Sequence, residues 1–345
     1  MRSTLILAGA LLITTALPAT AQMTTRLSKS TGNINGNLSS VVSASCLSGD
    51  SRYVVYQSDA YNLVSGDSNG ALDIFLRDRL LGVTTRISVD SSGQQANDSS
   101  RVAYISQDGR WVTFESSATN LVTGDTNAVK DIFIRDLVQG TTERISLAWN
   151  GAQADGDSAY ANPSAAGNLV VFHSSATNLV PADTNGVRDV FLRDRDASTT
   201  ECVSRGALGL GNADSSYGAV SADGRLVVFS SEASNLVVGD SNQYADIFLR
   251  DRVIGTTVRI SIGPSGEEAD GDSQFPLVTP DGRFVLFNSH ANNLVANDTN
   301  SSFDQDVFVR DLQAGTTERV NVGPAGQQGF GAAGGVAITP EGRYV

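Results

Sequence analysis

The sequence predicts an all-β protein that repeats one small antiparallel sheet about six times. A phrase of the form N-L-V-x-x-D-x-N occurs five times at an almost constant spacing, with its acidic residue at Asp67, Asp125, Asp183, Asp240 and Asp298. Each period holds four short runs rich in β-branched and aromatic residues, and none with the spacing of an amphipathic helix. A fixed period with four antiparallel strands is typical of one blade of a β-propeller.

The second repeat shows the four predicted strands in order. They are residues 101–106 (RVAYIS), 110–116 (RWVTFES), 131–136 (DIFIRD) and 142–147 (TERISL). The tripeptide Gln107-Asp108-Gly109 is a tight-turn signal between the first two strands, and Gly140 marks the turn between the last two. We therefore expect consecutive hairpins within each blade.

The two ends of the chain carry parts of one further blade. Residues 24–28 (TTRLS) match a fourth strand, and residues 336–345 (VAITPEGRYV) match a first strand and half of a second. We predict that the two termini share this last blade, as in propeller rings that close by joining both ends of the chain. It lacks a third strand, so we expect that the sequence is truncated at its C-terminus or that further blades are missing.

Several phrases resemble a known repeat. Residues 221–231 (SADGRLVVFSS), 245–261 (ADIFLRDRVIGTTVRIS) and 279–289 (TPDGRFVLFNS) are similar to the WD40-like, or TolB-like, β-propeller repeat. The resemblance covers essentially the whole chain after Ala21 and implies a propeller fold. The present repeat is longer than the usual blade of that family, and the excess lies in the N-L-V-x-x-D-x-N insertion and in the loop after the fourth strand.

Residues 1–21 have the features of a secretory signal peptide. Arg2 precedes an apolar stretch from Leu5 to Leu17, and Ala19-Thr20-Ala21 has the small-x-small form of a signal peptidase site. We predict cleavage after Ala21, a single propeller domain over residues 22–345, and a secreted or periplasmic location. No later stretch reaches the roughly 20 apolar residues of a membrane helix, so we expect no membrane insertion.

The charge and the cysteines limit the classes of partner. The formal net charge of −13 repels nucleic acid and favours cations, so we expect no nucleic-acid partner. The two cysteines, Cys46 and Cys202, fall in non-adjacent repeats, so we do not expect them to form a disulfide. Cys202 stands in a fourth-strand column that is otherwise occupied by Arg26, Arg86, Arg144, Arg259 and Arg319.

The repeated loops before the third strand carry oxygen side chains at alternate positions. Ca²⁺ takes six to eight oxygen ligands in irregular geometry, so these loops are candidate structural Ca²⁺ sites. In a second interpretation the same Asp and Asn side chains form Asx turns that hold a long loop without a metal. The candidate ligands are Asp67, Asn69, Asp73, Asp125, Asn127, Asp131, Asp183, Asn185, Asp189, Asp240, Asn242, Asp246, Asp298, Asn300, Asp304 and Asp306.

Catalytic residues are expected to break the repeat. The Arg-Asp pair that ends each third strand occurs five times, and we interpret it as cross-strand pairing with the fourth-strand arginines. His173 and His290 are unrepeated, but each is isolated, and we interpret them as surface residues. No H-E-x-x-H motif and no phosphate-binding glycine loop with its lysine is present in the sequence.

A second unrepeated column begins the first strands. Tyr160, Tyr217 and Phe275 are aromatic, whereas Ala44 and Val102 are not. The three rings form either a platform for a sugar or a peptide or a packing contact between neighbouring blades.

The sequence therefore favours an exported, non-catalytic binding or scaffold module, with a protein or glycan partner on the loop face. The alternative is a propeller enzyme, a glycan hydrolase or lyase, that uses the acidic loop face. Propellers serve both functions, so the fold does not decide between them.

Overall fold

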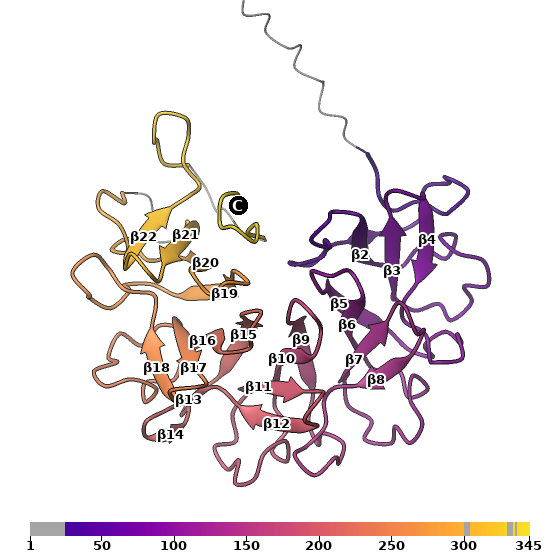
Figure 1. The fold of residues 1–345 in the computed structure, drawn as a ribbon, viewed down its shortest axis with the longest axis horizontal. Coiled ribbons are helices and arrows are strands. Elements are labelled where there is room, and N and C mark those ends of the chain that lie inside the picture. Colours follow the sequence, from indigo (N-terminus) through magenta and orange to yellow (C-terminus); the bar gives the residue numbers. More distant parts are fainter. Residues whose placement is uncertain (1–24, 300–303, 330–333, 335–336) are drawn as a thin grey trace, which may run out of the picture.

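The computed structural model describes residues 25–299, 304–329, 334 and 337–345, so the predicted signal peptide lies outside the described residues. Five four-stranded antiparallel sheets stand around a ring, and each contributes its first strand to the centre (Figure 1). This arrangement confirms the predicted all-β propeller of four-stranded blades. In this part of the chain, no helix has the length and apolar character needed to cross a membrane.

The strands of each sheet follow one another in chain order. Blade 1 contains β1 (Ser40–Val41), β2 (Tyr53–Ser58), β3 (Asp73–Asp78) and β4 (Val83–Arg86). Blade 2 contains β5 (Ser100–Ile105), β6 (Trp111–Ser116), β7 (Asp131–Asp136) and β8 (Thr142–Arg144). Blade 3 contains β9 (Ser158–Pro163), β10 (Leu169–Ser174), β11 (Asp189–Asp194) and β12 (Thr199–Cys202).

A small hairpin of β13 (Arg205–Gly206) and β14 (Gly209–Leu210) precedes the fourth sheet. Blade 4 contains β15 (Ser215–Val220), β16 (Leu226–Ser231), β17 (Asp246–Asp251) and β18 (Thr256–Arg259). Blade 5 contains β19 (Ser273–Val278), β20 (Phe284–Ser289), β21 (Asp306–Asp311) and β22 (Thr316–Arg319).

The hydrophobic core lies between neighbouring blades. In blade 2, Phe114 and Phe133 are fully buried cross-strand partners whose ring centroids are 5.9 Å apart. The same cluster includes Val55 and Ile74 of blade 1, so one core joins two sheets. Because an inner blade packs against a neighbour on each side, its middle strands are apolar on both faces instead of alternating.

Hydrogen bonds between blades repeat around the ring. Thr142 on β8 donates from Oγ1 to the carbonyl oxygen of Val89 at 2.6 Å and accepts from Arg135 Nη1 at 2.8 Å. In blade 1, Thr84 donates in the same way to the carbonyl oxygen of Lys29. The segment that follows residues 24–28 thus contacts blade 1 as the end of a preceding blade would.

The last blade position is flanked by both chain ends. Ile338 packs against Leu286 and Val307 of blade 5, and the turn from Thr339 to Tyr344 repeats the Asp-Gly turns of the other blades. Figure 1 shows the C-terminal segment beside an opening between blade 5 and blade 1. Among the described residues, no β-ladder joins this segment to residues 25–28, so the predicted shared blade is present as two separate flanks.

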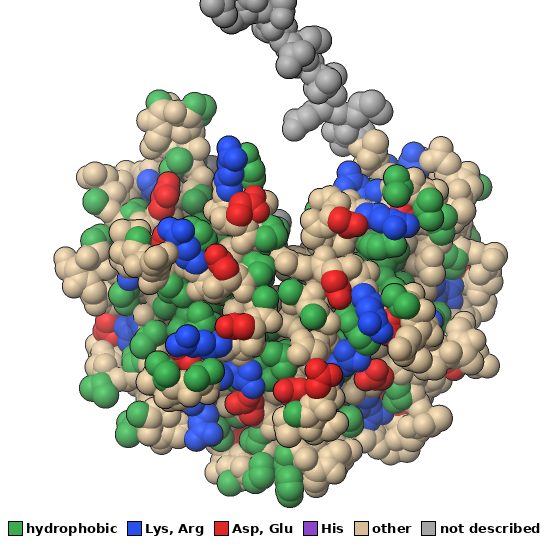
Figure 2. Space-filling model, viewed as in Figure 1, with side chains coloured by type: hydrophobic (Ala, Val, Ile, Leu, Met, Phe, Trp, Pro, Cys, Tyr) green, Lys and Arg blue, Asp and Glu red, His purple; other side chains and the backbone are tan. Residues whose placement is uncertain are grey.

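The Arg-Asp pairs of the third strands have partners other than those predicted. Asp136 accepts hydrogen bonds from Arg110 Nε at 3.1 Å and Nη2 at 2.6 Å, and from the backbone N–H groups of Val138 and Gln139. The prediction of a fourth-strand partner is wrong because the strand register places Trp111, and hence Arg110, beside Asp136, whereas Arg144 lies opposite Phe133. Figure 2 shows acidic and basic side chains side by side around one face of the ring.

The ion pair of Asp136 predicts a loss of stability in acid. Hydrogen bonds from Arg110, and then from the backbone, lower the pKa of Asp136 to about 2. A lowered folded-state pKa stabilises the protein above about pH 4, and this stabilisation disappears as the pH falls towards 2. We expect Asp136→Asn to lower the free energy of unfolding by about 1 kcal/mol at pH 7 and to have little effect near pH 2, as measured by urea denaturation.

Blade 3 supplies a matched control. Asp194 occupies in blade 3 the position that Asp136 has in blade 2. Asn168, however, stands at the position of Arg110, directly before the second strand. Asp194→Asn should therefore change stability less than Asp136→Asn at pH 7. Equal losses for the two variants would contradict the assigned role of the arginine.

Candidate functional site

In blades 1 to 4 the structure brings the predicted loop residues together at the start of the third strand. In blade 2, Asn127 donates from Nδ2 to Asp131 Oδ2 and to the carbonyl oxygen of Ala154, each at 3.0 Å. Asp131 is completely buried at the start of β7 and also accepts a hydrogen bond from Ser146. Asn300 is the one predicted ligand that lies outside the described residues.

An arginine lies between the carboxylates in four blades. Arg144 Nη2 is 3.0 Å from Asp125 Oδ1, and Arg144 Nε is 3.6 Å from Asp131 Oδ2. The guanidinium therefore places a positive charge between two of the carboxylates that are predicted Ca²⁺ ligands. The corresponding groups are Arg86 with Asp67 and Asp73, Arg259 with Asp240 and Asp246, and Arg319 with Asp298 and Asp306.

In blades 1, 3 and 4 the Asn two residues after the first Asp of the loop forms the predicted Asx turn, whereas Asn127 Oδ1 of blade 2 has no hydrogen-bond partner. Asn69 Oδ1 accepts from the backbone N–H of Ala71 at 3.2 Å, and Asn242 Oδ1 accepts from that of Tyr244 at 3.2 Å. Among the described residues, no group of three or more His, Cys, Asp or Glu side chains is arranged to hold a metal ion. The loops with an arginine therefore contain ion pairs, and in blades 1 and 4 also an Asx turn.

Blade 3 lacks the arginine and has a different loop chemistry. Asp183, Asn185 and Asp189 keep their places, but Cys202 occupies the position of the arginine. Asp183 is 8% exposed, and its Oδ1 has no hydrogen-bond partner. Burial, and then the neighbouring carboxylate of Asp189, raise the pKa of Asp183 to about 6. The free thiol of Cys202 does not replace the lost charge.

A row of aromatic side chains follows the innermost strands of blades 3, 4 and 5. The rings of Tyr160 and Tyr217 are 4.9 Å apart and edge-on, and those of Tyr217 and Phe275 are 4.3 Å apart. All three residues have left-handed backbone conformations, with φ of 54°, 55° and 55°. Each stands in a β-bulge of its strand, where the pairing register shifts. Bulky residues rarely adopt this conformation, and the backbone there is strained.

Side chains at the ends of the second strands hold these bulges across the blade boundary. Gln57 Oε1 accepts the backbone N–H of Val102 at 2.9 Å, and His173 Nδ1 accepts that of Tyr217 at 3.3 Å. His173 is only 5% exposed, and burial, with the nearby Arg188 and Lys130, lowers its pKa to about 3. The interpretation of His173 as a surface residue is therefore wrong, because the neighbouring blade covers it.

A polar hollow lies beside the aromatic row on blade 2. It measures about 260 Å³ and is lined by Asp98, Ser99, Arg101, Glu115, Ser117 and Lys130. Glu115 is 4% exposed, and its Oε1 is 3.3 Å from Lys130 Nζ. Burial raises the pKa of Glu115, and Lys130 opposes this effect. In the described part of the chain, Glu115 and His173 form no hydrogen bond with each other: Glu115 pairs with Lys130, and His173 accepts from Tyr217.

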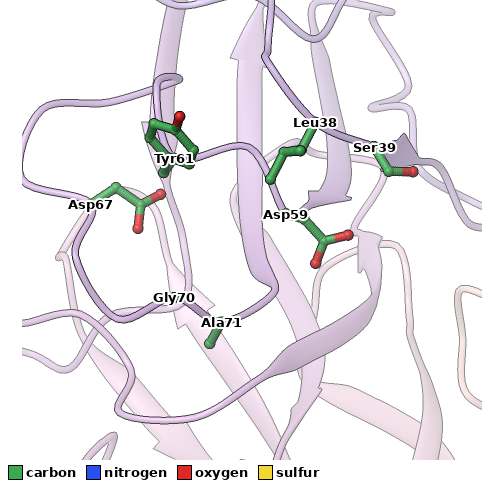
Figure 3. A pocket seen from close by; sticks show the side chains of 7 residues that line it. All are labelled: Leu38, Ser39, Asp59, Tyr61, Asp67, Gly70 and Ala71. Atoms are coloured by element: carbon green, nitrogen blue, oxygen red, sulfur yellow. The ribbon is translucent and has the colours of Figure 1, made fainter.

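A second hollow lies among the loops of blade 1. It measures about 420 Å³ and is lined by Leu38, Ser39, Asp59, Tyr61, Asp67, Gly70 and Ala71. Figure 3 shows Asp67 and Tyr61 on one side of it and Leu38 and Asp59 on the other. Because Asp67 is already paired with Arg86, Asp59 is the carboxylate of this hollow that forms no ion pair with another described residue.

Comparisons with known proteins place the fold. No family model and no curated protein matches the sequence. A solved structure assigned as TolB from Agrobacterium tumefaciens is 17% identical, with a TM-score of 0.50 over 81% of this chain and 80% of that chain.

Two solved structures of enzymes are similar to a comparable degree. An oligogalacturonate lyase in complex with manganese is 10% identical, with a TM-score of 0.52 over 83% of this chain and 67% of that chain. An oligogalacturonate lyase from Vibrio parahaemolyticus is 12% identical, with a TM-score of 0.51 over 82% of this chain and 66% of that chain. These likenesses, to a TolB structure and to two lyases alike, confirm the β-propeller fold, and at such low identity they show the fold alone.

The buried arginine predicts a large effect of one substitution. Arg144 is about 5% exposed in its side chain, and removing it leaves two buried carboxylates facing each other. We expect Arg144→Met to lower the free energy of unfolding by about 3–5 kcal/mol, measured by urea denaturation at pH 7. Arg110→Met is the control, because Arg110 is 38% exposed and should contribute much less. Similar losses in both variants would contradict the role of the buried guanidinium.

Proposed function

We propose that this chain is an exported binding module that holds a protein or glycan ligand on the loop face of a rigid propeller. The features of residues 1–21 support export, and a ring of packed blades supports rigidity. The net charge of −13 argues against a polyanionic ligand.

The aromatic row is the observation that supports a ligand site. Phe275 is 38% exposed, and Tyr160 and Tyr217 are half-buried, so ring surface remains available at the centre of the disc. Left-handed conformations at three bulky residues destabilise the fold by about 1 kcal/mol each. Val102 has the same left-handed conformation in blade 2 without an aromatic ring, so the strain belongs to the repeated bulge. What distinguishes blades 3 to 5 is the aromatic side chain that stands at this position and keeps part of its ring surface exposed.

The polar hollow supplies directional contacts beside the row. Glu115 and Tyr160 are neighbours, since the backbone N–H of Tyr160 helps to stabilise the charged form of Glu115. A ligand that stacks on Tyr160 therefore comes close to the Glu115–Lys130 pair. Apolar surface with a few polar groups is the usual composition of a ligand site.

A second candidate function is a propeller enzyme that acts on a glycan. The observation that favours it is the same hollow, where a buried carboxyl with a raised pKa lies beside an ammonium group. A general acid with this environment suits hydrolysis or elimination of a glycosidic bond. Under this alternative, the Glu115→Gln variant still binds the glycan but no longer cleaves it. Chromatography should then detect no cleavage product.

The binding proposal predicts that the ring of Tyr217 affects affinity more than stability. Tyr217→Gly removes the ring but keeps the left-handed backbone, so relief of strain partly offsets the lost packing. We expect binding to immobilised glycan and peptide arrays to fall at least tenfold, while the melting temperature changes by only a few degrees.

Tyr244→Ala is the matched control for this experiment. Tyr244 is a 42% exposed tyrosine on a loop of blade 4, away from the row, and its replacement should leave binding unchanged. The arrays identify the glycans and peptides that the native protein binds. If Tyr217→Gly binds each of them as strongly as the native protein does, the aromatic row is not the binding site.

A further inference from the structure

Blade 3 breaks the most regular electrostatic feature of the molecule. In the other four blades, an arginine joins the first and last carboxylates of the loop at distances between 2.8 and 3.6 Å. In blade 3 both carboxylates are present, as Asp183 and Asp189, and Cys202 stands in place of the arginine. The negative charge of the loop is therefore retained without its internal counter-charge.

From this difference we infer that blade 3 binds one hard divalent cation, Ca²⁺, between Asp183 and Asp189. The cation takes the electrostatic place that a guanidinium occupies in the other blades. This site is single and specific to blade 3, in contrast to five equivalent calcium loops, and it does not depend on any ligand at the aromatic row.

The free oxygen of Asp183 is an independent observation that points to a ligand. Asp183 is 8% exposed, and no hydrogen bond reaches its Oδ1. The equivalent atom of blade 2, Asp125 Oδ1, accepts from Arg144 Nη2 at 3.0 Å. A buried carboxylate oxygen without a partner is costly, and a cation removes that cost.

The other polar groups of this loop keep the second carboxylate in place. Asp189 is completely buried, its Oδ1 accepts from Ser204 Oγ at 2.6 Å, and its Oδ2 accepts from Asn185 Nδ2 at 2.6 Å. Asp189 Oδ2 is the counterpart of the oxygen that meets Arg144 Nε in blade 2. The two oxygens that face a guanidinium elsewhere are thus the first two ligands of the proposed site.

The chemistry of these donors favours Ca²⁺. Both are carboxylate oxygens, the ligands that hard cations prefer, and Ca²⁺ completes its shell with carbonyl oxygens and water in flexible geometry. Ala182 and Thr184, on either side of Asp183, are exposed, so an ion reaches the loop directly from solvent. With only two carboxylates we expect a dissociation constant of about 10⁻⁴–10⁻³ M, the range of extracellular calcium modules.

The test is a calcium titration of the purified protein. Thermal melts are recorded after chelation and then at increasing Ca²⁺ up to about ten times the expected dissociation constant, with isothermal titration calorimetry for the stoichiometry. We expect one ion per chain and a rise of at least about 2 °C in the melting temperature. Mg²⁺ should bind more weakly, because it demands near-octahedral geometry.

Three variants assign the response to blade 3. Cys202→Arg restores the residue of the other blades, so it should raise the melting temperature without calcium and abolish the calcium response. Asp183→Asn keeps the shape of the side chain and should also abolish the response. Cys202→Ser removes the thiol and should preserve it. Asp125→Asn, the matched change in blade 2, should preserve the response while lowering stability.

Several results would overturn the proposal. It fails if calcium neither binds nor raises the melting temperature of the native protein, in which case Asp183 remains without a metal. It also fails if Asp183→Asn keeps the full response, because the ion then binds elsewhere. Binding of Zn²⁺ but not Ca²⁺, lost in Cys202→Ser, would show a thiolate site instead of an oxygen site.

Discussion

A buried guanidinium between two carboxylates is the interaction on which the long loops of this propeller depend. Arg144 connects the fourth strand of its blade to Asp125 in the loop and to Asp131 at the start of the third strand. Because all three groups are buried, removal of the arginine leaves two buried carboxylates without a counter-charge. In blade 3, where Cys202 replaces the arginine, both carboxylates remain, and the Ca²⁺ that we propose would supply that counter-charge.

At the inner edge of the ring, hydrogen bonds between neighbouring blades hold the backbone in place of ion pairs. Its β-bulges place Tyr160, Tyr217 and Phe275 in strained conformations, and side chains of the neighbouring blade hold the bulged backbone. His173 performs this task as a neutral acceptor, since burial keeps its pKa near 3. The aromatic row therefore belongs to the framework of the ring and also presents ring surface at its centre. A surface built in this way is rigid in the free protein.

Much of the fold and part of the candidate site follow from the sequence. The period of the Asp-Asn phrase, the Asp-Gly turns and the β-branched runs predict the blades and their strand order. The loop residues also come together as their spacing suggests. The pairing of the loop carboxylates with an arginine does not follow from the sequence. Arg144 and Asp131 lie on different strands, and only the strand register shows which carboxylates Arg144 contacts.

The sequence by itself determined the repeat, the four strands of each blade and the places where the repeat is broken, because strand periodicity and turn chemistry act over a few neighbouring residues. Only the tertiary structure decided that His173 is buried, that Arg110 and not Arg144 pairs with Asp136, and that Asp183 Oδ1 lacks a partner. These properties depend on groups that are distant in the sequence or on the next blade, where burial and counter-charge are set by packing.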